Sequence, residues 1–125
     1  MGPKKHTKPG QIQLQAELVT AKLHNDLLEL LDHRAIVITL RKDYSDFQTQ
    51  NNLLSNNGRH ILTEMKEEFL KPMPSTKYQL HPGMLELSPL LQQKYDAKPS
   101  GDIDILYEDL PILYEDLQFF FKERL

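Results

Sequence analysis

Histidine and carboxylate side chains at helical spacing could bind a metal ion in one segment of the chain. His60 and Glu64 are four residues apart, which places them on one face of a helix, and Glu67 or Glu68 lies one turn further. The same spacing also produces an ordinary hydrogen-bonded surface pair, which is a much commoner arrangement. We therefore favour the surface pair and predict neither a metal site nor a cofactor.

The residue types that usually carry catalysis are absent or poorly placed. The chain has no cysteine, and none of its serines stands in a Gly-x-Ser-x-Gly sequence. Its five glycines are isolated, so they form no phosphate-binding loop. Adjacent carboxylates such as Glu108 and Asp109 point to different faces and suit acid–base catalysis badly. From these observations we predict that the protein is not an enzyme.

The end of the chain combines apolar, aromatic and acidic side chains. Residues 105–125 read ILYEDLP, ILYEDLQ and FFFKERL, so the first two groups of seven differ only in their last residue. From Asp102 onward there are seven carboxylates and two cations, a formal charge of −5, whereas the rest of the chain carries +2. A segment that is both apolar and charged needs a matching surface, either within the fold or on another molecule.

The matching surface can belong either to the rest of the fold or to another molecule. Apolar residues that step by four and three indicate a helix packed in the core or along a partner, and they are Leu106, Leu110, Leu113, Leu117 and Phe120. Alternatively, aromatic anchors among carboxylates are suited to a basic surface on another protein. The predicted partner-binding residues are Tyr107, Glu108, Asp109, Tyr114, Glu115, Asp116, Phe119, Phe120 and Phe121.

The strongest periodic signal predicts a helix from Gln11 to His33. Its apolar positions advance by 3.6 residues on average, and they are Ile12, Ala16, Val19, Leu23, Leu27 and Leu30. Residues 35–40, AIVITL, are rich in β-branched side chains and favour a short strand, with a continued helix as the alternative. The strand would pair with residues 76–81 or with a second copy of the chain.

Capping residues and prolines mark the remaining helices. After a charged turn at residues 41–43, Ser45 or Asp46 can begin a helix through Asn57, with Gly58 at its C-terminal end. Residues 59–71 then read as an amphipathic helix that stops before two prolines.

Two further helices are predicted towards the C-terminus. Ser88 and Pro89 form a favourable helix start, and this helix leads to Tyr95. Asp102 or Asp104 would cap the last segment. Pro111 either lies in the first turn of a helix that restarts there or kinks a continuous one.

Length and composition predict a small, mainly α domain of four to five helices, with room for a minor two-stranded β element. We expect a flexible basic tail over residues 1–10 and a single helical domain over residues 11–125. No apolar segment is long enough for a signal peptide or a membrane span, so we expect a cytoplasmic protein that does not bind membranes.

The overall charge of −3 argues against a dedicated nucleic-acid binder. Our first hypothesis is a non-catalytic protein-interaction module: an inhibitor, an immunity-type neutraliser, a chaperone or an adaptor. Its partner would be another protein with a basic surface, and a homodimer is also open. The alternative is a small nucleic-acid-binding transcriptional regulator, which would use the lysines of the tail and a helix pair between Ser45 and Lys71.

Overall fold

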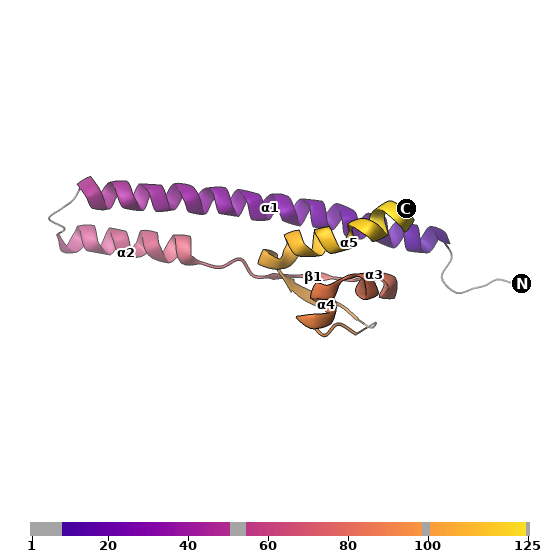
Figure 1. The fold of residues 1–125 in the computed structure, drawn as a ribbon. Coiled ribbons are helices and arrows are strands. Elements are labelled where there is room, and N and C mark those ends of the chain that lie inside the picture. Colours follow the sequence, from indigo (N-terminus) through magenta and orange to yellow (C-terminus); the bar gives the residue numbers. More distant parts are fainter. Residues whose placement is uncertain (1–8, 51–54, 99–100, 125) are drawn as a thin grey trace, which may run out of the picture. The chain divides into compact units, whose positions relative to one another are not determined.

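The computed structural model describes residues 9–50, 55–98 and 101–124, and these form five α-helices and a two-stranded antiparallel sheet (Figure 1). The elements are α1 (Pro9–Gln50), α2 (Asn56–Leu70), β1 (Ser75–Tyr78), α3 (Pro82–Leu87), α4 (Pro89–Gln93), β2 (Ile103–Leu106), a 3₁₀ turn η1 (Tyr107–Asp109) and α5 (Leu110–Arg124). The prediction of a mainly α fold with a minor two-stranded element is confirmed. Residues 1–8 of the predicted tail lie outside the described residues.

The internal contacts of the chain group it into two compact units. Unit 1 comprises residues 1–28 and 74–125, and unit 2 comprises residues 29–73. The first part of α1 therefore belongs to unit 1 and the second part to unit 2. The single helical domain over residues 11–125 stays a prediction.

The strand predicted at residues 35–40 is wrong, because α1 continues through this segment and through residues 41–43 without interruption. β-branched residues disfavour a helix by only a few tenths of a kcal/mol each. A continuous helix pairs the backbone groups of the segment internally, whereas a lone strand needs a second strand beside it. The strand β1 pairs with β2 instead.

The start predicted at Ser45 or Asp46 and the end predicted at Asn57 are also wrong, and residues 51–54 of that predicted helix lie outside the described residues. Residues 45–50 are the end of α1, and α2 begins at Asn56. The Ser55 hydroxyl caps α2 by accepting a hydrogen bond from the Gly58 amide at 3.1 Å. Gly58 therefore lies in the first turn of a helix rather than after its end. The amphipathic helix predicted over residues 59–71 is confirmed within α2.

The sheet joins two short strands in antiparallel register. Ser75 is opposite Leu106, and Tyr78 is opposite Ile103. The strand predicted around residues 76–81 is confirmed in part, since β1 covers Ser75–Tyr78. The partner of β1 is β2, which covers Ile103–Leu106. These residues were predicted to begin the last helix, so the predicted helix start at Asp102 or Asp104 is wrong.

Most of the described core of unit 1 comes from α1 and α5, which meet around the sheet. About once per turn, α5 contributes a leucine or phenylalanine to the core, so the core interpretation of the leucine spacing is confirmed for Leu110, Leu113, Leu117 and Phe120. Leu106 stays 42% exposed on β2. The other buried members are Ala16, Val19, Leu23, Tyr78, Leu80, Met84, Leu85, Leu91 and Ile105. Pro111 lies in the first turn of α5, so the helix restarts there.

Two short helices are capped by side chains that precede a proline. Ser88 begins α4 as predicted, because its hydroxyl accepts a hydrogen bond from the Leu91 amide at 3.2 Å. His81 begins α3, with its Nδ1 atom accepting from the Gly83 amide at 3.0 Å. This helix was not predicted, because a histidine is a less usual cap than serine or aspartate.

The two copies of ILYEDL have different backbone conformations. In residues 105–110 the sequence ends β2, forms the 3₁₀ turn η1 and begins α5, whereas in residues 112–117 it is entirely α-helical. Because the six residues are identical, the difference comes from their surroundings, which include Pro111 after the first copy and before the second. The pairing of Ile105 and Leu106 with β1 selects the extended form in the first copy.

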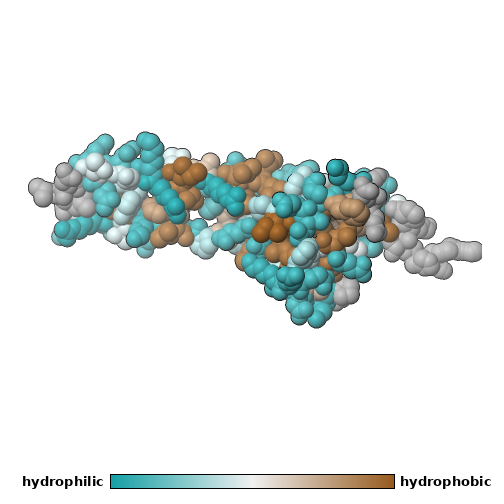
Figure 2. All heavy atoms as spheres, in the orientation of Figure 1, coloured by the Kyte–Doolittle hydropathy of each residue, from teal (hydrophilic) through white to brown (hydrophobic). Residues whose placement is uncertain are grey.

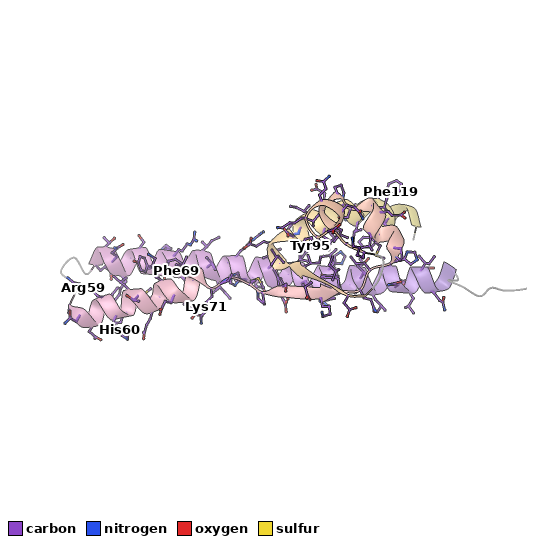
Figure 3. The ribbon with its side chains drawn as sticks, turned by 90° about the horizontal axis from the view of Figure 1, so that it is seen from below. Arg59, His60, Phe69, Lys71, Tyr95 and Phe119 are labelled. Atoms are coloured by element: carbon purple, nitrogen blue, oxygen red, sulfur yellow. The ribbon has the colours of Figure 1, made fainter. Side chains whose placement is uncertain are left out.

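Unit 2 is built from the second part of α1 and from α2. Leu30 and Leu62 are its buried apolar residues among those described. The rings of Tyr44 and Phe69 meet edge to face, with centroids 5.5 Å apart, and the Arg41 guanidinium lies 5.5 Å from the Phe69 ring centroid. Phe69 is labelled on α2 in Figure 3. These contacts join α1 to α2 near the C-terminal end of α2.

Candidate functional site

The first aspartate of the repeated sequence is engaged within unit 1. Asp109 is buried, accepts a hydrogen bond from the Tyr95 hydroxyl at 2.5 Å and pairs with the Lys94 ammonium at 2.8 Å. Burial raises the pKa of Asp109. The hydrogen bonds from Lys94 and Tyr95, together with the positive charge of Lys94, outweigh the effect of burial and hold the pKa below its ordinary value. This carboxylate therefore stabilises the fold in its ionised form.

Tyr95 links this carboxylate to the sheet. Its hydroxyl donates to Asp109 and accepts a hydrogen bond from the Leu106 amide at 3.0 Å. Burial and the neighbouring Asp109 carboxylate raise the pKa of Tyr95 to about 12, although the Leu106 amide acts in the opposite direction. The phenol is thus held in its neutral form.

The second aspartate of the repeat occupies a comparable position seven residues later. Asp116 accepts a hydrogen bond from the Ser88 hydroxyl at 2.8 Å and one from the Leu90 amide at 3.3 Å. Both donors belong to the start of α4, where amide groups lack helical partners and negative charge is favourable. Asp116 therefore completes the N-terminal cap that Ser88 begins.

Together the two aspartates fix both ends of α4. Asp116 binds its first residues and Asp109 binds Lys94 and Tyr95, which directly follow its last residue. Seven residues of α5 rise by about 10 Å, close to the length of a helix of five residues with its caps. The separation of seven residues between Asp109 and Asp116 is thus explained by their contacts with the two ends of α4.

The glutamates of the repeat point outward, together with two large apolar side chains. Glu108 and Glu115 are exposed, Ile112 is 50% exposed and Phe119 is 57% exposed. Ile112, Glu115 and Phe119 are spaced by three and four positions along one side of α5, and Glu108 lies four residues before Ile112 in the 3₁₀ turn η1. We call these four residues the α5 stripe. Figure 3 shows Phe119 at the outside of unit 1.

The structure divides the predicted partner-binding residues into two groups. Glu108, Glu115 and Phe119 are exposed, whereas Phe120 is 1% exposed in the core and both aspartates are used in the fold. Phe120 is therefore corrected from a surface anchor to a core residue. The intermediate positions are Tyr107, Tyr114 and Phe121, and the Tyr114 ring lies 5.5 Å from the ring of His24.

Ile112 belongs to the exposed set but was missing from the predicted partner-binding residues. Its signal in the sequence is the separation of seven residues from Phe119, which is two helical turns. Because the same segment also contains buried leucines at similar spacing, the outward stripe could be recognised only once the buried one was known.

A polar cluster that sequence analysis missed lies between α1 and β1 in unit 1. Asp26 is buried, accepts a hydrogen bond from the Tyr78 hydroxyl at 2.7 Å and pairs with Lys22 at 2.8 Å. Lys22 also donates to the Thr76 hydroxyl at 2.8 Å and lies 4.7 Å from the centroid of the Tyr78 ring. Every member has a partner within the cluster, so we assign it a structural role.

The described residues provide no metal cluster. His60 and Glu64 form a surface pair at 3.0 Å, and no group of three or more metal-ligating side chains gathers in the described part of the chain. A hollow of about 240 Å³ in unit 1 is lined by residues that include Tyr95, Asp96 and Ile103. It is smaller than typical sites for small organic ligands.

Comparison with known proteins gave no similarity that would identify the chain. No protein-family model matches it, and neither a curated sequence nor a solved structure matches it. Within the described residues, no helix combines the length and the apolar character that crossing a bilayer requires.

Proposed function

We propose that the protein is a non-catalytic protein-interaction module that binds a partner protein through the α5 stripe. The partner surface would be apolar with cations at its rim, because it must meet Ile112 and Phe119 and also two carboxylates. An inhibitor, neutraliser, chaperone or adaptor would each act in this way.

The observation that supports this proposal is the division of the repeat into inward and outward side chains. The aspartates, Phe120 and the leucines of α5 (Leu110, Leu113 and Leu117) all make contacts within unit 1 that account for them. Packing within the unit does not explain why Ile112 and Phe119 are half exposed beside two glutamates. Exposed large apolar side chains that cluster with charges are typical of protein interfaces.

The geometry of the stripe suits a groove or a second helix as its counterpart. Ile112 and Phe119 are two turns apart, about 10 Å along the axis, with Glu115 between them. A helix that presents apolar anchors at this spacing is recognised by an apolar groove or by another helix. The glutamates would accelerate and orient association with a basic partner.

The test is affinity capture with the full chain, followed by binding measurements on each purified captured protein. Ile112→Ser combined with Phe119→Ser should weaken the binding at least about tenfold, because buried apolar anchors carry most interface energy. Circular dichroism and thermal unfolding would establish that the double variant still folds.

Leu14→Ser is the matched control, because Leu14 is an equally exposed apolar residue on α1 at 58%. It should bind the partner like the unchanged protein. If the double variant and the unchanged protein bind every captured partner with equal affinity, the α5 stripe is not the binding site.

A further inference from the structure

A second exposed stripe lies on α1 within unit 2, and its residue types complement those of the α5 stripe. Leu31 is 57% exposed, Ile38 is 68% exposed, and Arg34 and Arg41 are exposed. The four positions are spaced by three, four and three residues, so they lie along one side of the helix. We call them the α1 stripe.

Figure 2 shows apolar side chains at the surface along α1, interspersed with hydrophilic ones. Apolar side chains between the arginines suit a protein partner better than a nucleic acid, because they gain nothing from a phosphate backbone. Arg41 is also held in place, since its guanidinium lies over the Phe69 ring.

We propose that the α5 stripe of one copy of the protein binds the α1 stripe of a second copy, with the two helices antiparallel. This inference rests on the proposed function and names a second copy of the chain as the partner. It therefore assigns to unit 2 the basic, apolar surface that the α5 stripe requires.

The antiparallel direction follows from the order of the residues. Read backwards, the α5 stripe is Phe119, Glu115, Ile112 and Glu108, and read forwards, the α1 stripe is Leu31, Arg34, Ile38 and Arg41. Each apolar residue then meets an apolar residue, and each glutamate meets an arginine. With all four positions aligned in the parallel direction, every pair would combine a charged residue with an apolar one. A parallel alignment shifted by one position forms three matching pairs, so the antiparallel alignment is the one that uses all four positions of both stripes.

The lengths of the two stripes also agree. Their end positions are eleven and ten residues apart respectively, about 16 Å and 15 Å along the helix axes. Within each stripe the two apolar residues are seven positions apart, with one charged residue of the stripe between them. Helices that pack together bring such residues into contact, and ion pairs between the helices set their direction and register. Arginine is well suited to these pairs, because its guanidinium can bind a carboxylate with two hydrogen bonds.

Sedimentation velocity of the full chain tests the proposal by charge reversal at one pair. Arg34→Glu alone and Glu115→Lys alone should each weaken self-association at least about tenfold, because like charges then face each other. An equimolar mixture of the two variants should restore association, since the reversed glutamate of one copy meets the reversed lysine of the other.

A mixture of Arg34→Glu with Glu108→Lys is the matched control, because these positions are not opposite each other in the proposed alignment. It should restore association less than the first mixture. Recovery in the first mixture also shows that both variants are folded.

Three results would overturn the proposal. The first is that the protein is monomeric at every concentration measured. The second is that neither single variant changes self-association. The third is that both mixtures recover association equally. The proposed function is judged separately: a monomeric protein whose capture of a different partner requires Ile112 and Phe119 would contradict self-association and support the proposed function.

Discussion

At the scale of single residues, neighbouring acids of the same repeat have opposite roles. Asp109 and Asp116 each fix one end of α4, whereas Glu108 and Glu115, which precede them, face solvent. Adjacent residues on a helix are separated by about a quarter turn or more, so one points inward and the next outward. The acidic composition of the segment therefore combines structural charges with charges available to a partner.

Replacing either aspartate with asparagine should destabilise the fold. We expect a loss of roughly 2 kcal/mol in the free energy of unfolding for Asp109→Asn and about 1 kcal/mol for Asp116→Asn, because charge-assisted hydrogen bonds are lost. Chemical denaturation at neutral pH measures both. Glu108→Gln and Glu115→Gln are the controls and should change it by less than about 0.5 kcal/mol.

The effect of Asp109→Asn should also depend on pH. The pKa of Asp109 is lowered in the folded protein, so its contribution is complete above the ordinary value of 3.8 and is lost as the pH falls through the lowered value. The difference in unfolding free energy between the variant and the unchanged protein should therefore shrink in acid. A constant difference down to the lowest pH at which the protein folds would contradict this account.

Tyr95 should make the fold sensitive to alkali. Its pKa is raised from 10.0 to about 12 in the folded protein, so its stabilising contribution is complete below pH 10.0 and is lost as the pH rises towards 12. Denaturation across this range should show a steeper loss of stability in the unchanged protein than in Tyr95→Phe. Identical slopes would show that Tyr95 is not protected from ionisation.

At the scale of elements, three predictions that rested on local signals were confirmed, whereas several helix boundaries and the strand at residues 35–40 were wrong. The confirmed predictions are the periodic stripe of residues 11–33, the helix start at Ser88–Pro89 and the amphipathic helix over residues 59–71. The strand at residues 35–40 and the helix at residues 103–106 were wrong. Strand formation depends on a partner distant in sequence, and no local pattern identified β1 and β2 as that pair.

The same limit applied to the candidate site. The sequence identified the acidic, aromatic segment, and Glu108, Glu115 and Phe119 of that segment are exposed. It could not separate inward from outward side chains, because apolar residues occur on several sides of α5. Knowledge of the tertiary packing, in which the Phe120 ring lies close to Gly83 of α3, was needed to assign Phe120 to the core.

A substitution on the exposed side of α1 distinguishes a helix from a strand at residues 35–40. Thr39 is exposed and helical, so Thr39→Ala should raise the free energy of unfolding by about 0.5 kcal/mol through helix propensity. Thermal or chemical denaturation measures the change. In a strand the same substitution would lower stability, and that result would contradict the helical assignment.

At the scale of the whole molecule, the chain contains two compact units with different amounts of buried apolar surface. Unit 1 has an extensive core, whereas Leu30 and Leu62 are the buried apolar residues among the described residues of unit 2. Regions with few buried contacts open more easily than regions with an extensive core. Unit 2 is therefore expected to be the first part to exchange its amide hydrogens.

Phe69→Ala should increase hydrogen exchange in α2 and leave α5 protected. The substitution removes the ring contacts with Tyr44 and Arg41, which belong to unit 2. Hydrogen–deuterium exchange with mass spectrometry would resolve the two helices. Lys71→Ala provides a control with little expected change, and an equal loss of protection in α5 would show that the two units unfold together.

The duplicated hexapeptide allows the influence of environment on backbone conformation to be measured inside one molecule. Residues 105–110 and 112–117 have the same composition and order, yet one copy is partly extended and the other helical. Infrared spectra could be recorded with an isotope label in the backbone carbonyl groups of one copy or of the other. Because the two copies have the same side chains, side-chain type would not contribute to a difference between the two spectra. Any difference in carbonyl frequency between them would report the surroundings alone.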